Sequence, residues 1–139
     1  MTKSLKRIFL VDDSKIFRFT VVKLFSITGY DGELVEFEDG QKLLDYLSQN
    51  LNNPDALPDL VLLDINMPVM GGWAFLEAYS KLEKPAKDFE IRILSSSIDP
   101  SDINRTQDFK DVNGYMTKPL NIPQVKELLE KRNTNISAA

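Results

Sequence analysis

Acidic side chains follow two of the short apolar runs in this sequence, at the point where each run ends. Asp12 and Asp13 come directly after Arg7–Val11, and Asp64 comes directly after residues 60–63. Carboxylates gathered at one place repel one another and resist ionising together unless a cation neutralises them. A hard divalent ion with oxygen ligands, such as magnesium, suits such a group. If the fold brings the three residues together, they predict a magnesium site.

A hydroxyl and an amine follow two later apolar runs. Ser95 comes after residues 91–94, and Lys118 stands before a proline after a further short run. Asp64 can act as a nucleophile, while Lys118 and Ser95 contact the oxygens of a phosphoryl group. A carboxylate is already ionised at neutral pH, so this chemistry needs no general base. The residue types therefore favour phosphoryl transfer to Asp64 with the help of magnesium.

Composition excludes several other kinds of site. The chain has no histidine and no cysteine, which removes Ser-His-Asp triads, thiolate nucleophiles, disulfides and the usual zinc sites. A phosphohistidine donor would therefore belong to another protein. The net charge of −4, without a basic run, argues against a nucleic-acid binder. The sequence shows no membrane-spanning stretch and no signal segment, so we expect a cytoplasmic protein without a membrane contact.

Apolar runs alternate with stretches of helical periodicity along the chain. We expect strands at 7–11, 34–37, 60–63, 91–94 and 114–116, and helices that begin near 14, 39, 72, 100 and 123. This alternation predicts an α/β, flavodoxin-like fold: a doubly wound five-stranded parallel sheet with helices on both faces. In the strand order 2-1-3-4-5, the first and third strands are neighbours at the switch point, where ligands bind beyond the strand ends.

The length of 139 residues suits one domain that spans residues 1–139,. We expect its core over about 6–131 and a frayed tail over 133–139. Two loops, at 50–58 and 81–90, are rich in polar residues or proline,.

Five short segments resemble the receiver domain of bacterial two-component response regulators, and in particular the stand-alone, chemotaxis-response-regulator-like members. Each segment is weak alone, but five in this order and spacing are specific. They are Val11-Asp12-Asp13-Ser14, Leu63-Asp64-Ile65-Asn66-Met67-Pro68, Gly72, Leu94-Ser95-Ser96 and Tyr115-Met116-Thr117-Lys118-Pro119. The resemblance extends from about Lys6 to Lys131.

The resemblance implies how the metal and the phosphoryl group are held. Asp64 would form the aspartyl phosphate and also contact Mg²⁺. Asp13 would bind the ion directly and Asp12 through water, and the backbone carbonyl of Asn66 would complete the protein ligands. Lys118 would hold the phosphoryl group.

The resemblance also implies a conformational switch. Ser95 would move toward the phosphoryl group, and Tyr115 would change its exposure when Ser95 moves. Two plainer interpretations stay open: Ser95 can be part of a polar turn, and Tyr115 can be a packing residue of an edge strand. We assign Trp73 to the packing of the third helix.

The expected function is a switch in two-component signal transduction rather than an enzyme with its own substrate. A sensor histidine kinase or histidine phosphotransfer protein would supply the phosphoryl group, and the face of the fourth helix, fifth strand and fifth helix would contact a downstream protein. The chain would be a monomer or a phosphorylation-dependent homodimer. Alternatively, it would be a phosphorelay intermediate that passes the phosphoryl group to another protein's histidine.

Three further hypotheses are weaker. A phosphatase of the haloacid-dehalogenase type would need an acid where Asn66 stands. In a flavin binder, Asp12 and Asp13 would lie beside the flavin phosphate, and their negative charges would repel it. A degenerate receiver, which binds partners without phosphorylation, would not need all three of Asp12, Asp13 and Asp64.

Two details depart from or vary within the family pattern. Gly71 replaces a residue that is usually polar, which would loosen the turn before the third helix,. Asn66 and Ser97 stand where side chains would line the path of an attacking water.

Overall fold

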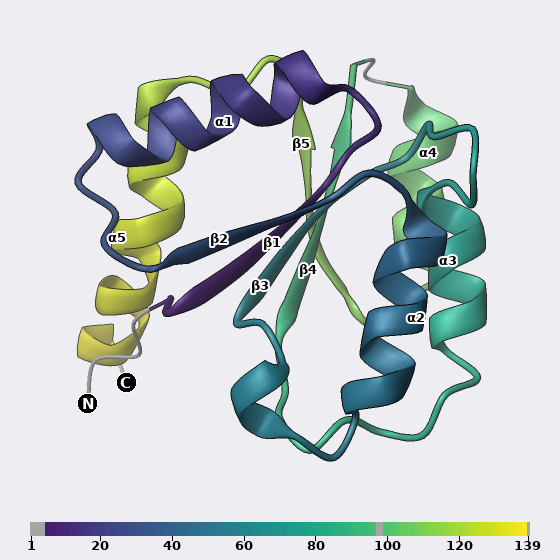
Figure 1. Cartoon of the computed structure of the whole chain (residues 1–139). Helices are drawn as coiled ribbons and strands as arrows, with labels where there is room; N and C mark the ends of the chain where they lie inside the picture. The colour runs from purple at the N-terminus through teal and green to yellow at the C-terminus, as the bar shows by residue number, and fades with distance from the viewer. Residues whose placement is uncertain (1–4, 97–98, 139) are drawn as a thin grey trace.

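The protein is described here from a computed structural model that covers residues 5–96 and 99–138, with side chains up to residue 130. Strands and helices alternate along the chain (Figure 1). The elements are β1 (Arg7–Val11), α1 (Lys15–Ile27), β2 (Glu33–Phe37), α2 (Gly40–Asn50), the 3₁₀ turn η1 (Pro54–Ala56), β3 (Leu60–Asp64), α3 (Gly72–Tyr79), β4 (Glu90–Ser95), α4 (Pro100–Thr106), β5 (Val112–Thr117) and α5 (Ile122–Ala138).

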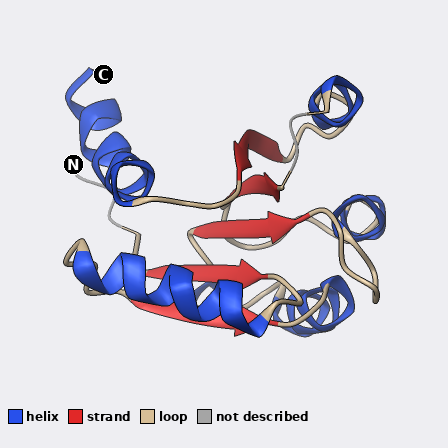
Figure 2. Cartoon of the chain, turned by 90° about the horizontal axis from the view of Figure 1, so that it is seen from above, coloured by secondary structure: helices blue, strands red, loops and turns tan. Residues whose placement is uncertain are grey.

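The strands form one parallel sheet in the order β2-β1-β3-β4-β5, which confirms the predicted topology. Figure 2 shows the sheet as a middle layer, with α1 and α5 on one face and α2, α3 and α4 on the other. Alternate residues of β1 face the two layers: Phe9 packs with the α2–α3 core, while Ile8 and Leu10 pack with the α1–α5 core. Every residue of β3 is buried, as expected of a strand covered on both faces,.

Side-chain caps begin the first two helices where the sequence predicts them. The Ser14 side chain accepts a hydrogen bond from the Phe17 amide at 3.1 Å. The Asp39 side chain accepts one from the Lys42 amide at 2.8 Å. Each cap satisfies an amide that has no partner within its own helix. Only three residues therefore separate β1 from α1 and two separate β2 from α2, which keeps the connecting loops short at the site.

The last helix is longer than the sequence analysis anticipates. We expected a frayed tail over 133–139, whereas α5 continues as a helix to Ala138, and residue 139 lies outside the described residues. After Pro123 this stretch holds neither glycine nor proline, the residues that most often end a helix,. Among the helices of the described part of the chain, none is both long and apolar enough to cross a membrane.

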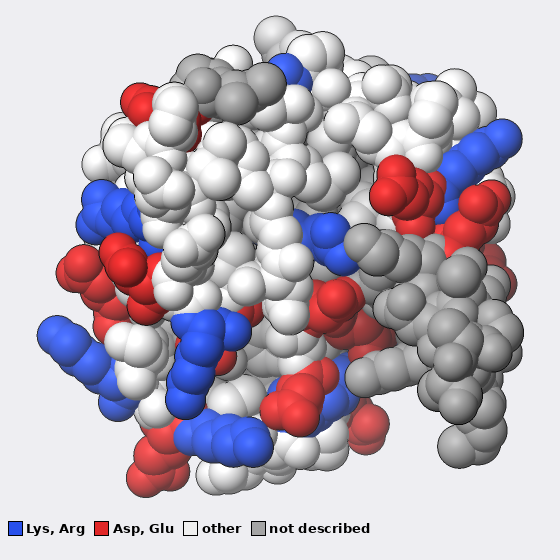
Figure 3. Space-filling model, turned by 180° about the vertical axis from the view of Figure 1, so that it is seen from behind, with Lys and Arg blue, Asp and Glu red and all other residues white. Residues whose placement is uncertain are grey.

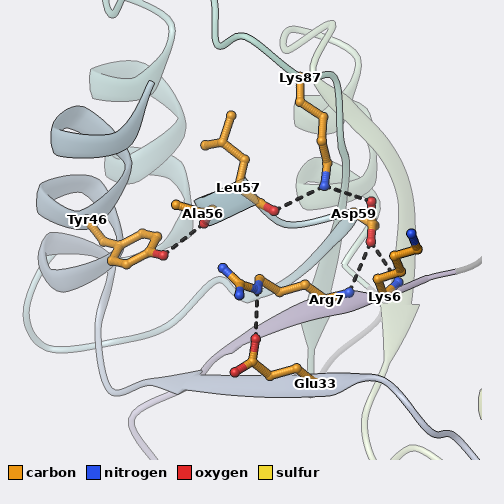
Figure 4. Close-up of polar contacts among 8 residues, drawn as sticks. All are labelled: Lys6, Arg7, Glu33, Tyr46, Ala56, Leu57, Asp59 and Lys87. Atoms are coloured by element: carbon orange, nitrogen blue, oxygen red, sulfur yellow. Dashed lines mark hydrogen bonds and ion pairs between the residues drawn. The ribbon is translucent and has the colours of Figure 1, made fainter. Parts of the chain in front are cut away.

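The two loops at 50–58 and 81–90, the longest expected from the sequence, contact each other at the end of the sheet away from the acidic cluster (Figure 4). The Lys87 ammonium donates to the Leu57 carbonyl at 3.2 Å and pairs with the Asp59 carboxylate at 3.0 Å. The Asp59 carboxylate also accepts from the Lys6 and Arg7 amides at 2.7 and 3.0 Å. Asp59 thus ties the starts of β1 and β3 to the loop before β4.

A tight glycine turn connects β3 to α3. Met70 has a φ of 50°, and its carbonyl accepts from the Gly40 amide at 3.1 Å. A Cβ at Gly71 would lie 2.5 Å from the Ile65 carbonyl oxygen, so glycine is required here by close packing. The expectation that Gly71 loosens this turn is therefore wrong, because the small residue allows the backbone to pack more tightly.

Aromatic and charged contacts attach α4 to α3. None of the residues of α4, all of which the structure describes, is buried. The ring of Trp73 in α3 stacks on Phe109 with centroids 5.9 Å apart, and the Arg105 guanidinium lies 5.0 Å from the same indole. Arg105 also approaches Glu77 at 3.6 Å. Trp73 is therefore a packing residue of α3, as expected.

Candidate acidic phosphoacceptor site

The fold brings the three predicted acidic residues together at the carboxyl ends of β1 and β3. One carboxylate oxygen from each of Asp12, Asp13 and Asp64 lies within 4.8 Å of the others. Asp12 and Asp64 are buried, whereas Asp13 is exposed. These strands are neighbours in the sheet, so the site forms at the topological switch point that the sequence analysis named.

Lys118 supplies the positive charge of this site. Its ammonium lies 2.5 Å from Asp12 Oδ2 and 3.2 Å from Asp64 Oδ1. The Lys118 amide donates to the Ser95 carbonyl at 2.8 Å, which holds the end of β5 against β4. One ammonium therefore bridges the two buried carboxylates.

The environment changes the acidity of Asp64. Burial, and after it the nearby charge of Asp12, raise the pKa of Asp64 to about 6. The Lys118 charge and hydrogen bond, and a hydrogen bond donated by the Asn66 amide, act in the opposite direction on this pKa. Burial by itself would lower the pKa of Lys118, but its contacts with Asp12 and Asp64 outweigh burial and raise it. Lys118 therefore stays charged at neutral pH.

The remaining predicted residues differ in their burial and in the element that carries them. Ser95 is buried at the end of β4, next to β3 in the sheet. Asn66 is exposed two residues after Asp64, and its amide faces the Asp64 carboxylate. Tyr115 is half-buried in β5, away from the acidic cluster and against the core beneath α3. Ser97 lies outside the described residues.

Two residues of α1 belong to the site although the sequence analysis did not name them. The ring of Phe17 lies 4.3 Å from the Lys118 ammonium, in a cation–π contact,. The Arg18 guanidinium donates to the Asp12 carbonyl at 2.6 Å and to Glu36 at 2.9 Å. The place of Arg18 in the first turn after the Ser14 cap, directly beyond Asp12 and Asp13, could have pointed to it, whereas Phe17 has the spacing of an ordinary core residue.

The donor set fits a hard divalent cation. All three side chains offer carboxylate oxygens, the ligands that magnesium prefers, and two of the carboxylates are buried close to each other,. A single lysine offsets only part of this negative charge. Asp12, Asp13 and Asp64 are therefore the residues that would hold Mg²⁺.

A comparison with known protein families shows to which family this chain belongs. Residues 8–130 match the response regulator receiver domain. The chain belongs to the response regulator receiver family. Members of this family are signalling modules that are typically phosphorylated on an aspartate. The match favours the receiver interpretation over the phosphatase and flavin-binding hypotheses.

Individual receiver proteins resemble this one over most of its length. The probable methanogenesis regulatory protein FilR2 of Methanothrix harundinacea is 28% identical over 124 residues, which cover 89% of this chain and 79% of FilR2. A two-component response regulator structure from Cytophaga hutchinsonii has a TM-score of 0.82 and 25% identity, and covers 95% of this chain and 99% of its own. The phosphorylated cyanobacterial phytochrome response regulator RcpA has a TM-score of 0.73 and 30% identity, and covers 98% of this chain and 97% of its own.

Proposed function

We propose that this receiver domain is a phosphoacceptor switch that takes a phosphoryl group on Asp64 in the presence of Mg²⁺. The donor is a phosphohistidine of a sensor kinase or phosphotransfer protein, or a small phosphodonor. The observation that carries the proposal is the buried pair Asp12–Asp64 bridged by the Lys118 ammonium at 2.5 and 3.2 Å. A nucleophilic carboxylate, two acidic metal ligands and one fixed cation make a complete set for phosphoryl transfer.

The transfer exchanges one bond to phosphorus for another. An Asp64 oxygen forms a P–O bond while the P–N bond of the donor phosphohistidine breaks, and the bonding pair leaves with the imidazole nitrogen, which takes a proton. The Lys118 ammonium lies within reach of an oxygen on the transferred group and offsets its charge,. Mg²⁺ held by Asp12, Asp13, Asp64 and the Asn66 carbonyl would offset further charge on the phosphoryl oxygens.

The modified site has two residues that can respond to the new charge. The Ser95 hydroxyl, at the end of the adjacent strand β4, would donate a hydrogen bond to the phosphoryl group,. Tyr115 lies on β5 opposite Ile93 of β4, so a shift of β4 would alter its packing. This movement would change the face of α4, β5 and α5 that a downstream protein contacts.

The proposal treats the domain as a substrate that assists its own modification, acting in the cytoplasm where its kinase is active. The solved structure of RcpA is of a phosphorylated protein, which supports an acceptor role here. We expect a monomer when unmodified, and phosphorylation-dependent dimerisation is tested by sedimentation velocity with and without phosphodonor.

The decisive experiment is intact-mass spectrometry after incubation with acetyl phosphate and Mg²⁺. We expect one added phosphoryl group, lost in Asp64→Ala and suppressed by a chelator. Asp55→Ala is the matched control, because Asp55 is an exposed acid in η1, which precedes the start of β3, whereas Asp64 lies at the end of that strand. The proposal is wrong if no adduct forms with acetyl phosphate or with a phosphorylated phosphotransfer protein. Rapid hydrolysis of unrelated phosphoesters would instead support the phosphatase hypothesis.

A further inference from the structure

A hollow lies between the sheet and α5, separate from the acidic site. Its volume is about 410 Å³, and it is lined by residues of β4, β5 and α5: Arg92, Tyr115, Met116, Thr117, Gln124, Glu127 and Leu128. Figure 3 looks onto this side of the molecule, where uncharged surface runs between charged side chains of both signs. A hollow of this size is in the usual range for sites that bind small molecules.

Arg92 places an incompletely paired cation in the wall of this hollow. Its side chain is only 13% exposed, and its buried Nε has no hydrogen-bond partner among the described residues. The Glu90 carboxylate approaches Nη2 at 3.8 Å, which is beyond hydrogen-bond length,. Burial lowers the pKa of Arg92, and the charge of Glu127 only partly offsets this effect. A buried donor without an acceptor destabilises the protein unless something else supplies one.

The neighbouring strand β5 leaves room for the Arg92 guanidinium. Gly114 of β5 is the partner of Arg92 in the sheet. A Cβ at Gly114 would lie 2.9 Å from Arg92 Nη1, so a larger residue would displace the guanidinium. The absence of a side chain at Gly114 thus leaves the space beside β5 that the Arg92 guanidinium occupies.

The other lining residues define the chemistry of a ligand. Met116 and Leu128 give the hollow an apolar wall, while Thr117 and Gln124 add a hydroxyl and an amide. Among the described lining residues Arg92 is the only cation, and Glu127 is an exposed anion. A planar carboxylate matches the fork of a guanidinium, and Glu127 and the net charge of −4 would repel a dianion more strongly than a monoanion,.

We propose that this hollow binds a small monocarboxylate with an apolar body, whose carboxylate accepts from the Arg92 guanidinium and whose body lies against Met116 and Leu128. The proposal goes beyond the phosphoacceptor function, because none of the residues that line the hollow belongs to the acidic cluster. Binding would not depend on Asp64.

The test follows the Nε–H signal of Arg92 by NMR in arginine-labelled full-length protein while benzoate is added. We expect a saturable shift of this signal with a Kd in the millimolar range. Benzyl alcohol, which has the same ring without the charge, and inorganic phosphate, which has charge without an apolar body, should each bind at least tenfold more weakly. Equal effects of benzoate and phosphate, or a linear response without saturation, would overturn the proposal.

Three variants sharpen the test. Glu127→Gln removes the repelling charge and should tighten benzoate binding by about two- to threefold, because a like charge in largely solvated space repels the carboxylate only weakly. Arg92→Gln should abolish binding. If Arg92→Gln does not fold, Gly114→Ala keeps the arginine but displaces its guanidinium, and should weaken binding at least fivefold. If Glu127→Gln instead lowers stability and leaves benzoate without effect, Glu127 is simply the internal partner of Arg92 and the proposal is wrong.

A short peptide with one glutamate separates the two sources of a carboxylate. Benzoate binding with little peptide binding supports a small-molecule ligand. Peptide binding without benzoate binding would overturn the proposal in favour of a protein partner. Asp64→Ala should bind benzoate as strongly as the unaltered chain does, although it forms no phosphoryl adduct. Loss of benzoate binding and loss of phosphorylation are therefore measured separately, and either proposal can fail without the other.

Discussion

Lys118 lies where four other elements meet, and its position depends on all of them. Its backbone is fixed to the Ser95 carbonyl of β4, its ammonium contacts carboxylates after β1 and β3, and the Phe17 ring of α1 packs against that ammonium. A flexible lysine loses considerable side-chain entropy when it is held in one geometry. The aromatic contact limits the ammonium to positions that face Asp12 and Asp64.

Replacing Phe17 should therefore slow phosphorylation without blocking it. Phe17→Leu keeps an apolar side chain but removes the ring face. The lost cation–π contact with Lys118 is worth about 1 kcal/mol at a partly buried site. We expect the rate of phosphorylation by acetyl phosphate to fall about fivefold, and Phe17→Tyr to keep the original rate. The measurement is the initial rate of adduct formation by intact-mass spectrometry.

Phe19 of the same helix provides the matched control. Its ring also faces a lysine, with Lys23 at 5.4 Å, but the side chain is 62% exposed and lies away from the site. Phe19→Leu should leave the rate unchanged. Equal losses in Phe17→Leu and Phe19→Leu would show that the helix, rather than the contact with Lys118, sets the rate.

The acidity of Asp64 predicts a pH-dependent stability. Folding raises the pKa of Asp64 from 3.8 to about 6. Between these values the folded protein holds a proton that the unfolded chain has lost, so stability falls as the pH rises through this window. Above about pH 6 the cost is constant, at about 3 kcal/mol for a shift of about two units. Below pH 4 the cost disappears.

Asp64→Asn should therefore stabilise the metal-free protein at pH 8 and have little effect at pH 4. We expect a gain of about 1–3 kcal/mol at pH 8, since the variant also loses the contact with Lys118. Urea denaturation in the presence of a chelator measures this gain at both pH values. A gain of the same size at pH 4 and pH 8 would rule out the ionisation of Asp64 as its cause.

The acidic residues were predictable from the sequence, whereas the aromatic one was not. Asp12, Asp13 and Asp64 each interrupt an apolar run, and parallel strands bring their carboxyl ends to one edge. Phe17 has the helical spacing of an ordinary core residue. Its contact with Lys118 depends on the path of a side chain that arrives from β5, and no local pattern encodes that path.

At the scale of elements, Asp59 joins the starts of β1 and β3, whereas the acidic cluster lies at the other ends of these strands. Its carboxylate accepts from two backbone amides and one ammonium. The opposing effects on its pKa are burial, which raises it, and the contacts with Lys87, Arg7 and Lys6, which together lower it. Because folding lowers this pKa, Asp59 contributes stability above its unfolded pKa, and the contribution is lost as the pH falls below about 4.

Asp59→Ala should destabilise the protein by about 1–2 kcal/mol at pH 7, because the exposed Lys6 amide and the part-buried Arg7 amide both lose a charged acceptor,. Urea denaturation measures the loss, and Asp55→Ala in the neighbouring exposed turn is the control. The double variant with Lys87→Ala should lose less than the sum of the single variants, since both remove the same ion pair. Strict additivity would contradict the contact shown in Figure 4.

The elements were predictable to the extent that local signals mark them. Apolar runs identify β1 and β3, and the capping residues Ser14 and Asp39 identify the starts of α1 and α2. The end of α5 was placed too early because residues after Lys131 become polar without any residue that stops a helix. The contact between the two long loops depends on strand order, so the sequence analysis left their role open.

At the scale of the whole molecule, charge is distributed unevenly between the ends of the sheet. One end gathers carboxylates with a single ammonium between them, and the other end pairs Asp59 with several donors. A cation that binds at the first end should therefore stabilise the entire fold, because the unfolded chain has no such cluster.

Magnesium should raise the melting temperature by a few degrees. At a tenfold excess of Mg²⁺ over its Kd, binding contributes about 1.4 kcal/mol, or about 4 °C for a domain of this size. Asp13→Asn should lose most of this shift while folding normally, since Asp13 is exposed. Differential scanning fluorimetry with Mg²⁺ and, as a control, K⁺ at equal ionic strength measures both. An equal shift in Asp13→Asn would place the ion elsewhere.

The stacked contact between Trp73 and Phe109 has a practical consequence. Trp73 is the only tryptophan in the sequence, and its indole touches both Phe109 and Arg105 on the far side of the α3–α4 boundary. Ultraviolet excitation at the red edge therefore selects one chromophore whose emission depends on that boundary. Any signal that repositions α4 can be followed in real time by the protein's own emission, with no dye attached and no residue replaced.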